Sequence, residues 1–326
     1  LVEVEDSRLQ AKRRTHLSMA AAEQRAATQT PNMKNAFYTL RPLTKRFGAE
    51  VLGCDLKSIE YTPAFIARVK EDIKEHRFLL FRKQDLSGQR QVDFSAKLGR
   101  IESTFYKHPR SPHPDIFRVS NDESEGCRNV GRTGWHLDGT FMETPFMFQT
   151  MYFPSVAEGG ETWFVPLKEL YELQDPATRD RWDRMWMITG KRQAPMHPLV
   201  YKHPFRGDTT MCFHCGEPFV SAFAVDGATS PTAKRQLQRE ILDPGPIQKE
   251  LTTAIEAILD EFGIRMKWEA GDMTINDNLG LAHYATPGTQ SNRAQVGLRI
   301  LHRTTIMGGK ETIPMKEDGR TTKTFD

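Results

Sequence analysis

The stretch GWHLDGTF, residues 134–141, places two metal-binding residue types, His136 and Asp138, two positions apart. Side chains at i and i+2 of a β-strand share a face, so on a strand the imidazole and the carboxylate would converge on one point. A divalent metal could bind there, although such a pair taken alone is more often a buried histidine hydrogen-bonded to its neighbour. A metal site therefore requires a third ligand. Two histidines and one carboxylate on one face of the metal is the arrangement of non-haem Fe(II) oxygenases.

His283 is the candidate for the third ligand. It follows GDMTINDNLGLA, which reads as a turn and a strand entering a polar loop, and it precedes YATPG. Other histidines lie in contexts that indicate no ligand role: His16 in a polar tail, His76 at the end of a charged helix, and His197 and His203 beside prolines. We therefore expect His136, Asp138 and His283 to meet in the folded protein.

Four stretches of the chain resemble the motifs of a known enzyme family in their order and approximate spacing. They are WHLDGTF, EGGETWF, INDNLGLAHYA and LRILHRTTIMGG. The family is that of taurine dioxygenase and 2,4-dichlorophenoxyacetate dioxygenase, which depend on Fe(II) and 2-oxoglutarate. The segment HPLVYKHPFRGDTTMCFHCG, residues 197–216, is similar to a strand-turn-strand segment of these enzymes. The resemblance covers roughly residues 37–310.

The resemblance implies a role for each matching residue. His136, Asp138 and His283 would bind Fe(II), leaving room for the bidentate cosubstrate 2-oxoglutarate and for O2. Thr162 in GGETW matches a threonine that hydrogen-bonds the distal carboxylate of 2-oxoglutarate, and Arg299 matches its arginine partner. A guanidinium can bind that carboxylate with two parallel hydrogen bonds.

The stretch between His283 and Arg299 departs from the family pattern, because it is several residues longer than in taurine dioxygenase. A longer surface loop costs little. It leaves Arg293 as an alternative to Arg299 for holding 2-oxoglutarate, although RILHR aligns better with Arg299.

The substrate would be a small anionic organic molecule. Arg303, four residues after Arg299, matches the arginine that holds the acidic group of taurine, unless an internal carboxylate such as Asp277 neutralises it. Further candidates around an anion share polar or basic side chains near the pocket mouth: Tyr106, Lys107, His108, Arg110, Asn121 and Arg132. For any one of these, a solvated loop residue is an equally good interpretation.

The reaction implied is oxidation of an unactivated C–H bond coupled to conversion of 2-oxoglutarate to succinate and CO2. Hydroxylation is the expected outcome, with fragmentation if the new hydroxyl shares its carbon with a sulfonate or ether oxygen. The alternatives are desaturation or kainoid-like oxidative cyclisation of an amino-acid-derived precursor in natural-product biosynthesis, and a jelly-roll binding protein without catalysis. In each enzymatic case the protein positions the substrate and the cofactor supplies the reactivity.

The elements that must position these residues are short strands flanked by helices. Helical patterns cover residues 62–77, 166–185 and 245–263, and strand-like runs rich in β-branched and aromatic residues lie between them. We expect a polar tail over residues 1–36 and one domain over residues 37–326. Periodicity predicts a mainly β protein with flanking helices, and the resemblance implies a double-stranded β-helix, which is a cupin-like jelly roll.

The bulk composition excludes several classes of protein. The 326 residues include 45 basic and 42 acidic side chains, so the formal charge of +3 predicts no nucleic-acid partner. No run reaches the ~18 apolar residues of a membrane span, and we expect no membrane partner. The four cysteines indicate a reducing, cytoplasmic location. Cys212 and Cys215 of CFHC are expected to be free thiols, and homo-oligomerisation stays open.

Overall fold

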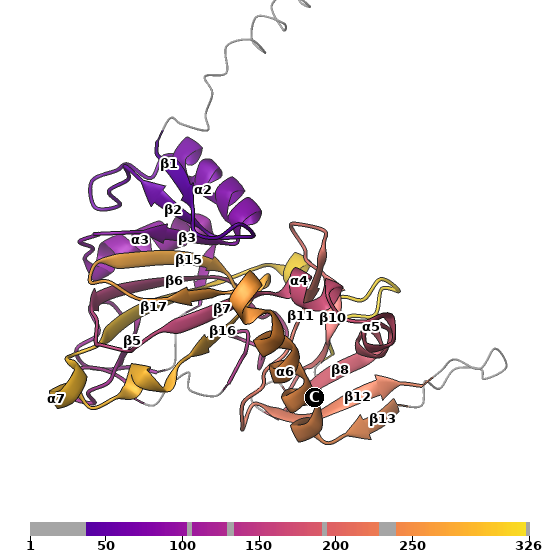
Figure 1. The fold of residues 1–326 in the computed structure, drawn as a ribbon. Helices are drawn as coiled ribbons and strands as arrows, with labels where there is room; N and C mark the ends of the chain where they lie inside the picture. The colour runs from indigo at the N-terminus through magenta and orange to yellow at the C-terminus, as the bar shows by residue number, and fades with distance from the viewer. Residues whose placement is uncertain (1–36, 103–105, 129–133, 191–193, 228–238, 324–326) are drawn as a thin grey trace, which may run out of the picture. The chain divides into compact units, whose positions relative to one another are not determined.

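The largest sheet has the strand order β1-β2-β3-β15-β6-β17-β4, and β5 also pairs with β17 (Figure 1). The computed structural model describes residues 37–102, 106–128, 134–190, 194–227 and 239–323, and Leu40–Asp326 form one compact unit. The predicted tail, residues 1–36, lies outside the described residues. The strands of this sheet are β1 (Thr39–Pro42), β2 (Ala49–Leu52), β3 (Phe78–Phe81), β4 (Arg100–Glu102), β5 (Phe117–Ser120), β6 (Phe146–Ser155), β15 (Asp272–Asp277) and β17 (Ile300–Met307).

Strand β6 lies at the centre of the large sheet, between β15 and β17, and pairs antiparallel with both. Successive side chains of a strand point to opposite faces. Met151 and Phe153 accordingly join the apolar core on one face, while Thr150 hydrogen-bonds Ser95 of helix α3 on the other, with 3.0 Å between the two hydroxyl oxygens. Gln149 shares the face of Met151 and is the polar residue of this strand that the site uses.

Helices α2 (Pro63–His76) and α3 (Gly88–Leu98) cover the outer face of the large sheet. Thr62 caps α2 by accepting a hydrogen bond from Phe65 N at 3.2 Å, and the helix confirms the pattern predicted over residues 62–77. Helix α3 was not predicted from the sequence. Its buried face includes Gln91 and Ser95, and these two polar residues interrupt the apolar periodicity that marks a helix.

A smaller sheet, with the order β14-β7-β16, faces the large one. Its strands are β14 (Ile264–Met266), β7 (Thr162–Pro166) and β16 (Leu281–Ala285). Phe164 of β7 meets Phe78 of β3 with 4.9 Å between ring centroids, and Leu281 joins the same apolar cluster. Two open sheets that enclose a core between them are the arrangement expected of a jelly roll.

A second apolar cluster joins the small sheet to the segment 167–262. This segment contains a hairpin of β10 (Val200–Lys202) and β11 (Thr209–Met211), and a sheet of β13 (Arg239–Leu242), β12 (Val220–Asp226), β8 (Met185–Thr189) and β9 (Met196–Pro198). Its longest helix is α6 (Pro244–Phe262), which confirms the helix predicted over residues 245–263.

The helical pattern predicted over residues 166–185 corresponds to two short helices, and Met185 already belongs to β8. The two helices are α4 (Leu167–Glu172) and α5 (Pro176–Asp183). Asp175 caps α5 by accepting hydrogen bonds from Ala177 N and Thr178 N, and Pro176 has no N–H with which to continue the preceding helix.

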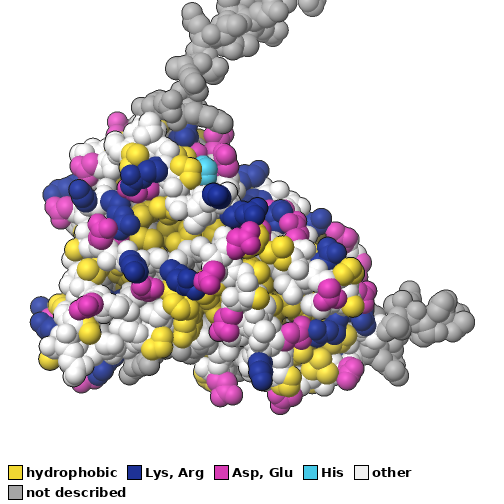
Figure 2. Space-filling view, in the orientation of Figure 1, with side chains coloured by type: hydrophobic (Ala, Val, Ile, Leu, Met, Phe, Trp, Pro, Cys, Tyr) yellow, Lys and Arg dark blue, Asp and Glu magenta, His cyan; other side chains and the backbone are white. Residues whose placement is uncertain are grey.

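The remaining elements are η2 (Pro287–Gln290), α7 (Arg293–Val296) and η3 (Lys310–Thr312). None of the helices in the described part of the chain is both long and apolar enough to cross a membrane. On the face shown in Figure 2, Lys and Arg side chains interleave with Asp and Glu, in line with the nearly balanced charge of the sequence.

Candidate active site

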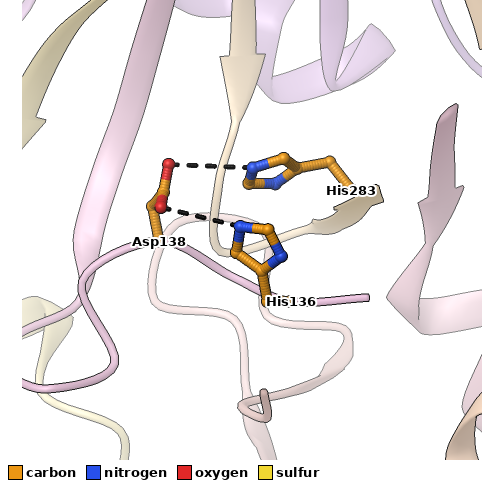
Figure 3. A group of neighbouring side chains, drawn as sticks. All are labelled: His136, Asp138 and His283. Atoms are coloured by element: carbon orange, nitrogen blue, oxygen red, sulfur yellow. Dashed lines mark ion pairs between the residues drawn. The ribbon is translucent and has the colours of Figure 1, made fainter. Parts of the chain in front are cut away.

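His136, Asp138 and His283 come together between the two facing sheets (Figure 3). Their ligand atoms all lie within 4.8 Å of one another. One carboxylate oxygen of Asp138 lies 3.7 Å from His136 Nε2, and the other lies 3.7 Å from His283 Nε2. The expectation of one strand is wrong in detail, because His136 forms an isolated β-bridge and Asp138 begins a turn. The three side chains converge all the same.

Main-chain pairing brings the two histidines together. His283 lies on β16, and the backbone of His136 pairs with it through two hydrogen bonds, N to O, of 3.1 and 3.0 Å. The turn at Asp138 is held by Asn278, which follows β15 and is fully buried. Asp138 N donates to Asn278 Oδ1 and Asn278 Nδ2 donates to Asp138 O, each at 2.9 Å.

The protonation states of the cluster suit metal binding, for which imidazoles must be neutral and the carboxylate ionised. Burial lowers the pKa of His136, and burial together with His136 lowers that of His283 to about 3. Burial alone would raise the pKa of Asp138, but the charge of Arg303 holds it well below its usual range. His136 Nδ1 lies 2.7 Å from Gly134 O and donates to it, so Nε2 keeps its lone pair.

Two residues that sequence analysis missed, Gln149 and Asn278, form hydrogen bonds with Asp138. Gln149 Nε2 donates to Asp138 Oδ2 at 2.5 Å, and Asn278 fixes the main chain as described above. Gln149 left a detectable signal, because it is the single amide in the apolar run FMFQTMYF of a central strand. Asn278 lies inside INDNLGLAHYA, one of the motifs that resemble the family.

Arg299 is a buried residue immediately before β17. Arg299 is 3% exposed, and burial lowers the pKa of its guanidinium to about 10. Its guanidinium carbon lies 5.2 Å from the centroid of the Phe153 ring. Within the described ranges no carboxylate reaches ion-pair distance of it. A Cβ at Gly160 would lie 3.2 Å from Arg299 Cδ, so this glycine of EGGETW gives the side chain room.

A chain of ring contacts joins Arg299 to Thr162. Phe153 stacks on Trp268 at 3.9 Å between centroids, and Trp268 Nε1 donates to Thr162 Oγ1 at 3.1 Å. A hydroxyl that accepts from an indole still has its own proton to donate. Thr162 and Arg299 therefore line the same region. Arg293, in contrast, lies in α7 with its side chain 47% exposed and paired with Asp122 at 2.7 Å.

Arg303 points into the His-Asp-His cluster. It forms an ion pair with Asp138 Oδ2, and its guanidinium carbon lies 5.0 Å from the centroid of the Phe117 ring. The internal carboxylate that pairs with Arg303 is therefore Asp138, whereas Asp277, the partner considered from sequence, lies 2.9 Å from His203. Tyr106 stacks on the same Phe117 ring, with 5.2 Å between the two ring centroids.

The other predicted substrate residues make their described contacts away from the cluster. Lys107 Nζ donates to Pro114 O, His108 Nε2 lies 3.1 Å from Glu123 O, and Arg110 pairs with Glu125 at 2.9 Å. The amide of Asn121 is occupied by main-chain groups. Arg132 lies outside the described residues.

The CFHC thiols have no metal or disulfide partner in the described part of the chain. Cys212 is buried, Cys215 is half-buried, and both are free. Burial raises the pKa of Cys215 to about 12, so its thiol is protonated and unreactive at neutral pH.

The fold and the cluster together define a jelly-roll protein with a candidate non-haem metal centre between its sheets. Residues 39–305 match the family described as taurine catabolism dioxygenase TauD, TfdA family, and the chain belongs to it. The chain is accordingly a 2-oxoglutarate-dependent dioxygenase whose cofactors are Fe(II), 2-oxoglutarate and O2. The family, the enzyme class and the cofactors implied by the motifs are thereby confirmed.

Named relatives agree with this assignment over nearly their whole length. An alpha-ketoglutarate-dependent sulfate ester dioxygenase of Pseudomonas putida is 25% identical and covers 87% of this chain and 93% of its own. An (S)-phenoxypropionate/alpha-ketoglutarate-dioxygenase of Delftia acidovorans is 26% identical, covering 76% of this chain and 89% of its own.

Solved structures confirm the fold class. A taurine dioxygenase from Burkholderia xenovorans is similar with a TM-score of 0.68 at 25% identity, covering 89% of this chain and 96% of that one. AAD-2 in complex with Mn(II) and N-oxalylglycine is similar in fold, with a TM-score of 0.64 at 20% identity over 85% of this chain and 99% of that one.

Proposed function

We propose that the protein oxidises a C–H bond of a small anionic organic substrate, with fragmentation where the product is unstable. His136, Asp138 and His283 would hold Fe(II), and Arg299 with Thr162 would hold the distal carboxylate of 2-oxoglutarate. The main support is a cluster of neutral imidazoles and a carboxylate together with the buried guanidinium of Arg299, which has no ion-pair partner among the described residues. Bound Fe(II) would supply the O2 chemistry that protein side chains lack.

Arg299 supports the cosubstrate site because a buried cation without a counter-ion is costly. An ionised group out of water costs several kcal/mol unless it is paired. Among the described residues none supplies that pair, whereas a dicarboxylic 2-oxo acid would. The exposed ion pair of Arg293 with Asp122 leaves no such need. These observations favour Arg299 over Arg293.

Arg303 supports an anionic substrate through the charge balance of the site. The formal charge of the loaded site would be +1. It is the sum over Fe(II), the carboxylate of Asp138, the guanidinium groups of Arg299 and Arg303, and a 2-oxoglutarate dianion. In a site shielded from water such a charge is strongly attractive to an anion. The named relatives act on sulfate esters and phenoxypropionates, which are anionic, and this agrees with the proposal.

The alternatives gain no comparable support. The relatives named above point neither to oxidative cyclisation nor to desaturation in natural-product biosynthesis, and membership of an enzyme family disfavours a binding protein without catalysis. For location, we retain the cytoplasm as a proposal, since all four cysteines are free thiols.

The test of this function is substrate-dependent succinate formation in the presence of Fe(II), 2-oxoglutarate and O2. A panel of alkyl sulfates, sulfonates and phenoxy acids is compared with the methyl esters of the phenoxy acids, in the wild type and in Arg303→Ala. We expect turnover of at least one anion, rejection of the neutral esters, and loss of that discrimination in Arg303→Ala. Equal turnover of acid and ester by the wild type would refute an anionic substrate.

A further inference from the structure

We propose that Asn121 is a positioning residue that sets the affinity of the site for 2-oxoglutarate by fixing the main chain from which Arg299 projects. The inference rests on the proposed role of Arg299. Asn121 follows strand β5, is 2% exposed, and does not itself reach the cofactor region in its described contacts. Its effect would be transmitted through the backbone.

The amide of Asn121 makes three hydrogen bonds, all to one segment. Its Oδ1 accepts from Arg299 N at 2.8 Å, and its Nδ2 donates to Gly297 O at 2.9 Å and to Ser291 O at 3.1 Å. These partners lie at the beginning and at the end of the stretch that contains α7. One side chain thus joins both ends of this stretch to the end of β5.

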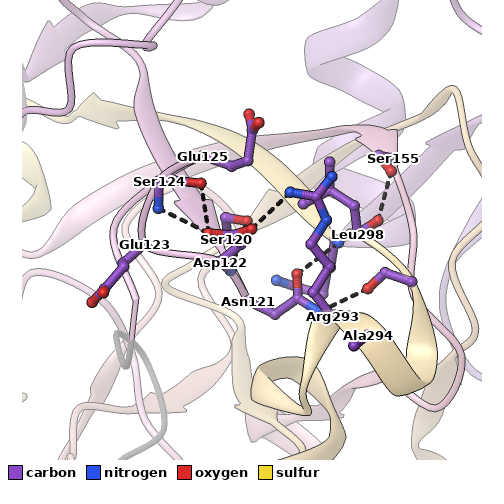
Figure 4. A network of polar contacts seen from close by, with 12 residues as sticks. Ser120, Asn121, Asp122, Glu123, Ser124, Glu125, Ser155, Arg293, Ala294 and Leu298 are labelled. Carbon is purple, nitrogen blue, oxygen red and sulfur yellow. Dashed lines mark hydrogen bonds and ion pairs between the residues drawn. The ribbon is translucent and has the colours of Figure 1, made fainter.

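The segment held in this way connects β16 with Arg299. It leaves β16, passes through η2 and α7, and reverses at Gly297, whose φ of 89° lies in the left-handed region that favours glycine. Figure 4 shows two further anchors, Ser155 Oγ donating to Leu298 O at 2.6 Å and the exposed pair of Arg293 with Asp122. Asn121 is the anchor that bonds the amide of Arg299 itself.

The placement of the Arg299 guanidinium depends on this backbone because the side chain has few other restraints. Within the described residues it has no ion pair, and its Nε is buried without a hydrogen-bond partner. A bidentate contact with a carboxylate tolerates little displacement of the guanidinium. Small displacements of groups that bind or orient a ligand are costly even when their cause is remote.

Gln84 is a matched control for a purely structural role. It is 7% exposed, and its amide also makes three hydrogen bonds to main-chain groups, accepting from Leu56 N at 2.8 Å and donating to Arg82 O at 2.8 Å and Cys54 O at 3.1 Å. Removing either amide should therefore destabilise the fold to a similar degree. Only Asn121 contacts the segment that presents Arg299.

The experiment measures binding of N-oxalylglycine, an unreactive analogue of 2-oxoglutarate, to the Mn(II)-loaded full chain by calorimetry. We expect Asn121→Ala to raise the dissociation constant about tenfold or more, because the main-chain N–H of Arg299 loses its acceptor. Gln84→Ala should leave that constant within about twofold, although both variants lower the melting temperature similarly. The affinity for Mn(II) alone should be unchanged in both.

Asn121→Asp provides a second reading if the alanine variant folds poorly. It keeps the acceptor for Arg299 N, loses both donors, and should give a dissociation constant between those of the wild type and Asn121→Ala. Equal dissociation constants for Asn121→Ala and the wild type, or equal increases in Asn121→Ala and Gln84→Ala, would overturn the positioning role. Unchanged binding in Arg299→Ala would instead refute the proposed function of Arg299, so the two failures are distinguishable.

Discussion

Thr162 illustrates at the scale of single residues how the candidate site is prepared. Its hydroxyl accepts the indole N–H of Trp268, so it is oriented before any ligand arrives and keeps its own proton to donate. Arg299 beyond it is charged and buried, and Arg303 keeps the buried carboxylate of Asp138 ionised. Each group is therefore in the state that its proposed partner requires.

Thr162→Val should weaken binding of N-oxalylglycine by about 1 kcal/mol, or roughly fivefold, because one neutral hydrogen bond is lost. It should also destabilise the fold by about 1–3 kcal/mol, since the buried N–H of Trp268 loses its acceptor. Calorimetry and urea unfolding measure the two effects separately. Thr162→Ser should restore both, and a failure of serine to restore binding would contradict the hydroxyl role.

Asn278→Ala should lower the affinity for a divalent metal by about 10- to 100-fold, as expected for a residue that orients a metal ligand. The cause would be freedom of the turn at Asp138, which Asn278 holds through Asp138 N and O. Mn(II) titration of the purified variant measures this. Wild-type Mn(II) affinity in a folded Asn278→Ala protein would show that Asp138 does not need this support.

At the scale of elements, α3 shows why part of the fold was not predictable. Gln91 and Ser95 are completely buried on its inner face, where Gln91 Nε2 donates to His302 O at 3.0 Å on β17. The apolar signal of this buried face is therefore reduced to Val92, Phe94 and Leu98. The helices over residues 62–77 and 245–263 were predictable because their buried positions are mostly apolar.

Gln91→Ala should destabilise the protein by about 2–3 kcal/mol, because it leaves polar groups of β17 unpaired and a cavity beneath the helix. Gln89→Ala on the exposed face of the same helix should change stability by less than about 0.5 kcal/mol. Urea unfolding compares the two variants. Similar losses for both would mean that α3 is not anchored through Gln91.

The candidate site likewise contains residues that the sequence predicted and residues whose role depends on the tertiary structure. The spacing of His136, Asp138 and His283 was informative because all three residues fall within motifs that resemble one family. The choice between Arg293 and Arg299 was not settled by sequence, since it depends on which guanidinium the tertiary structure buries. Asn121 was predicted as a substrate residue because it lies shortly before the metal motif in the sequence. Its main-chain partners are 170 and 176 positions away, and sequence alone does not reveal such contacts.

At the scale of the whole molecule, buried neutral histidines make folding sensitive to acid. Burial lowers the pKa of His197 to about 4, and burial with Arg118 nearby lowers that of His302 to about 3. An unfolded chain protonates histidine near pH 6.5. Between about pH 6.5 and 4 the unfolded chain thus binds protons that the folded chain does not, and stability falls as the pH falls.

We expect the unfolding free energy of the metal-free protein to drop on acidification through this window, by up to about 1.4 kcal/mol per pH unit for each such histidine. Urea unfolding across the window measures the slope. His197→Asn should make the slope shallower by up to that amount, whatever its effect on absolute stability. A wild-type stability that is flat across the window would contradict the neutral, buried state of these histidines.

The central claim is that the His-Asp-His cluster holds the metal and Arg299 holds the cosubstrate in one pocket. A crystal structure of the protein with Mn(II) and N-oxalylglycine tests it most directly, with anomalous scattering to locate the metal. We expect one Mn(II) bound by His136, Asp138 and His283, and the distal carboxylate of the analogue on Arg299 and Thr162. Metal density away from these three residues, or the distal carboxylate on Arg293, would contradict the account.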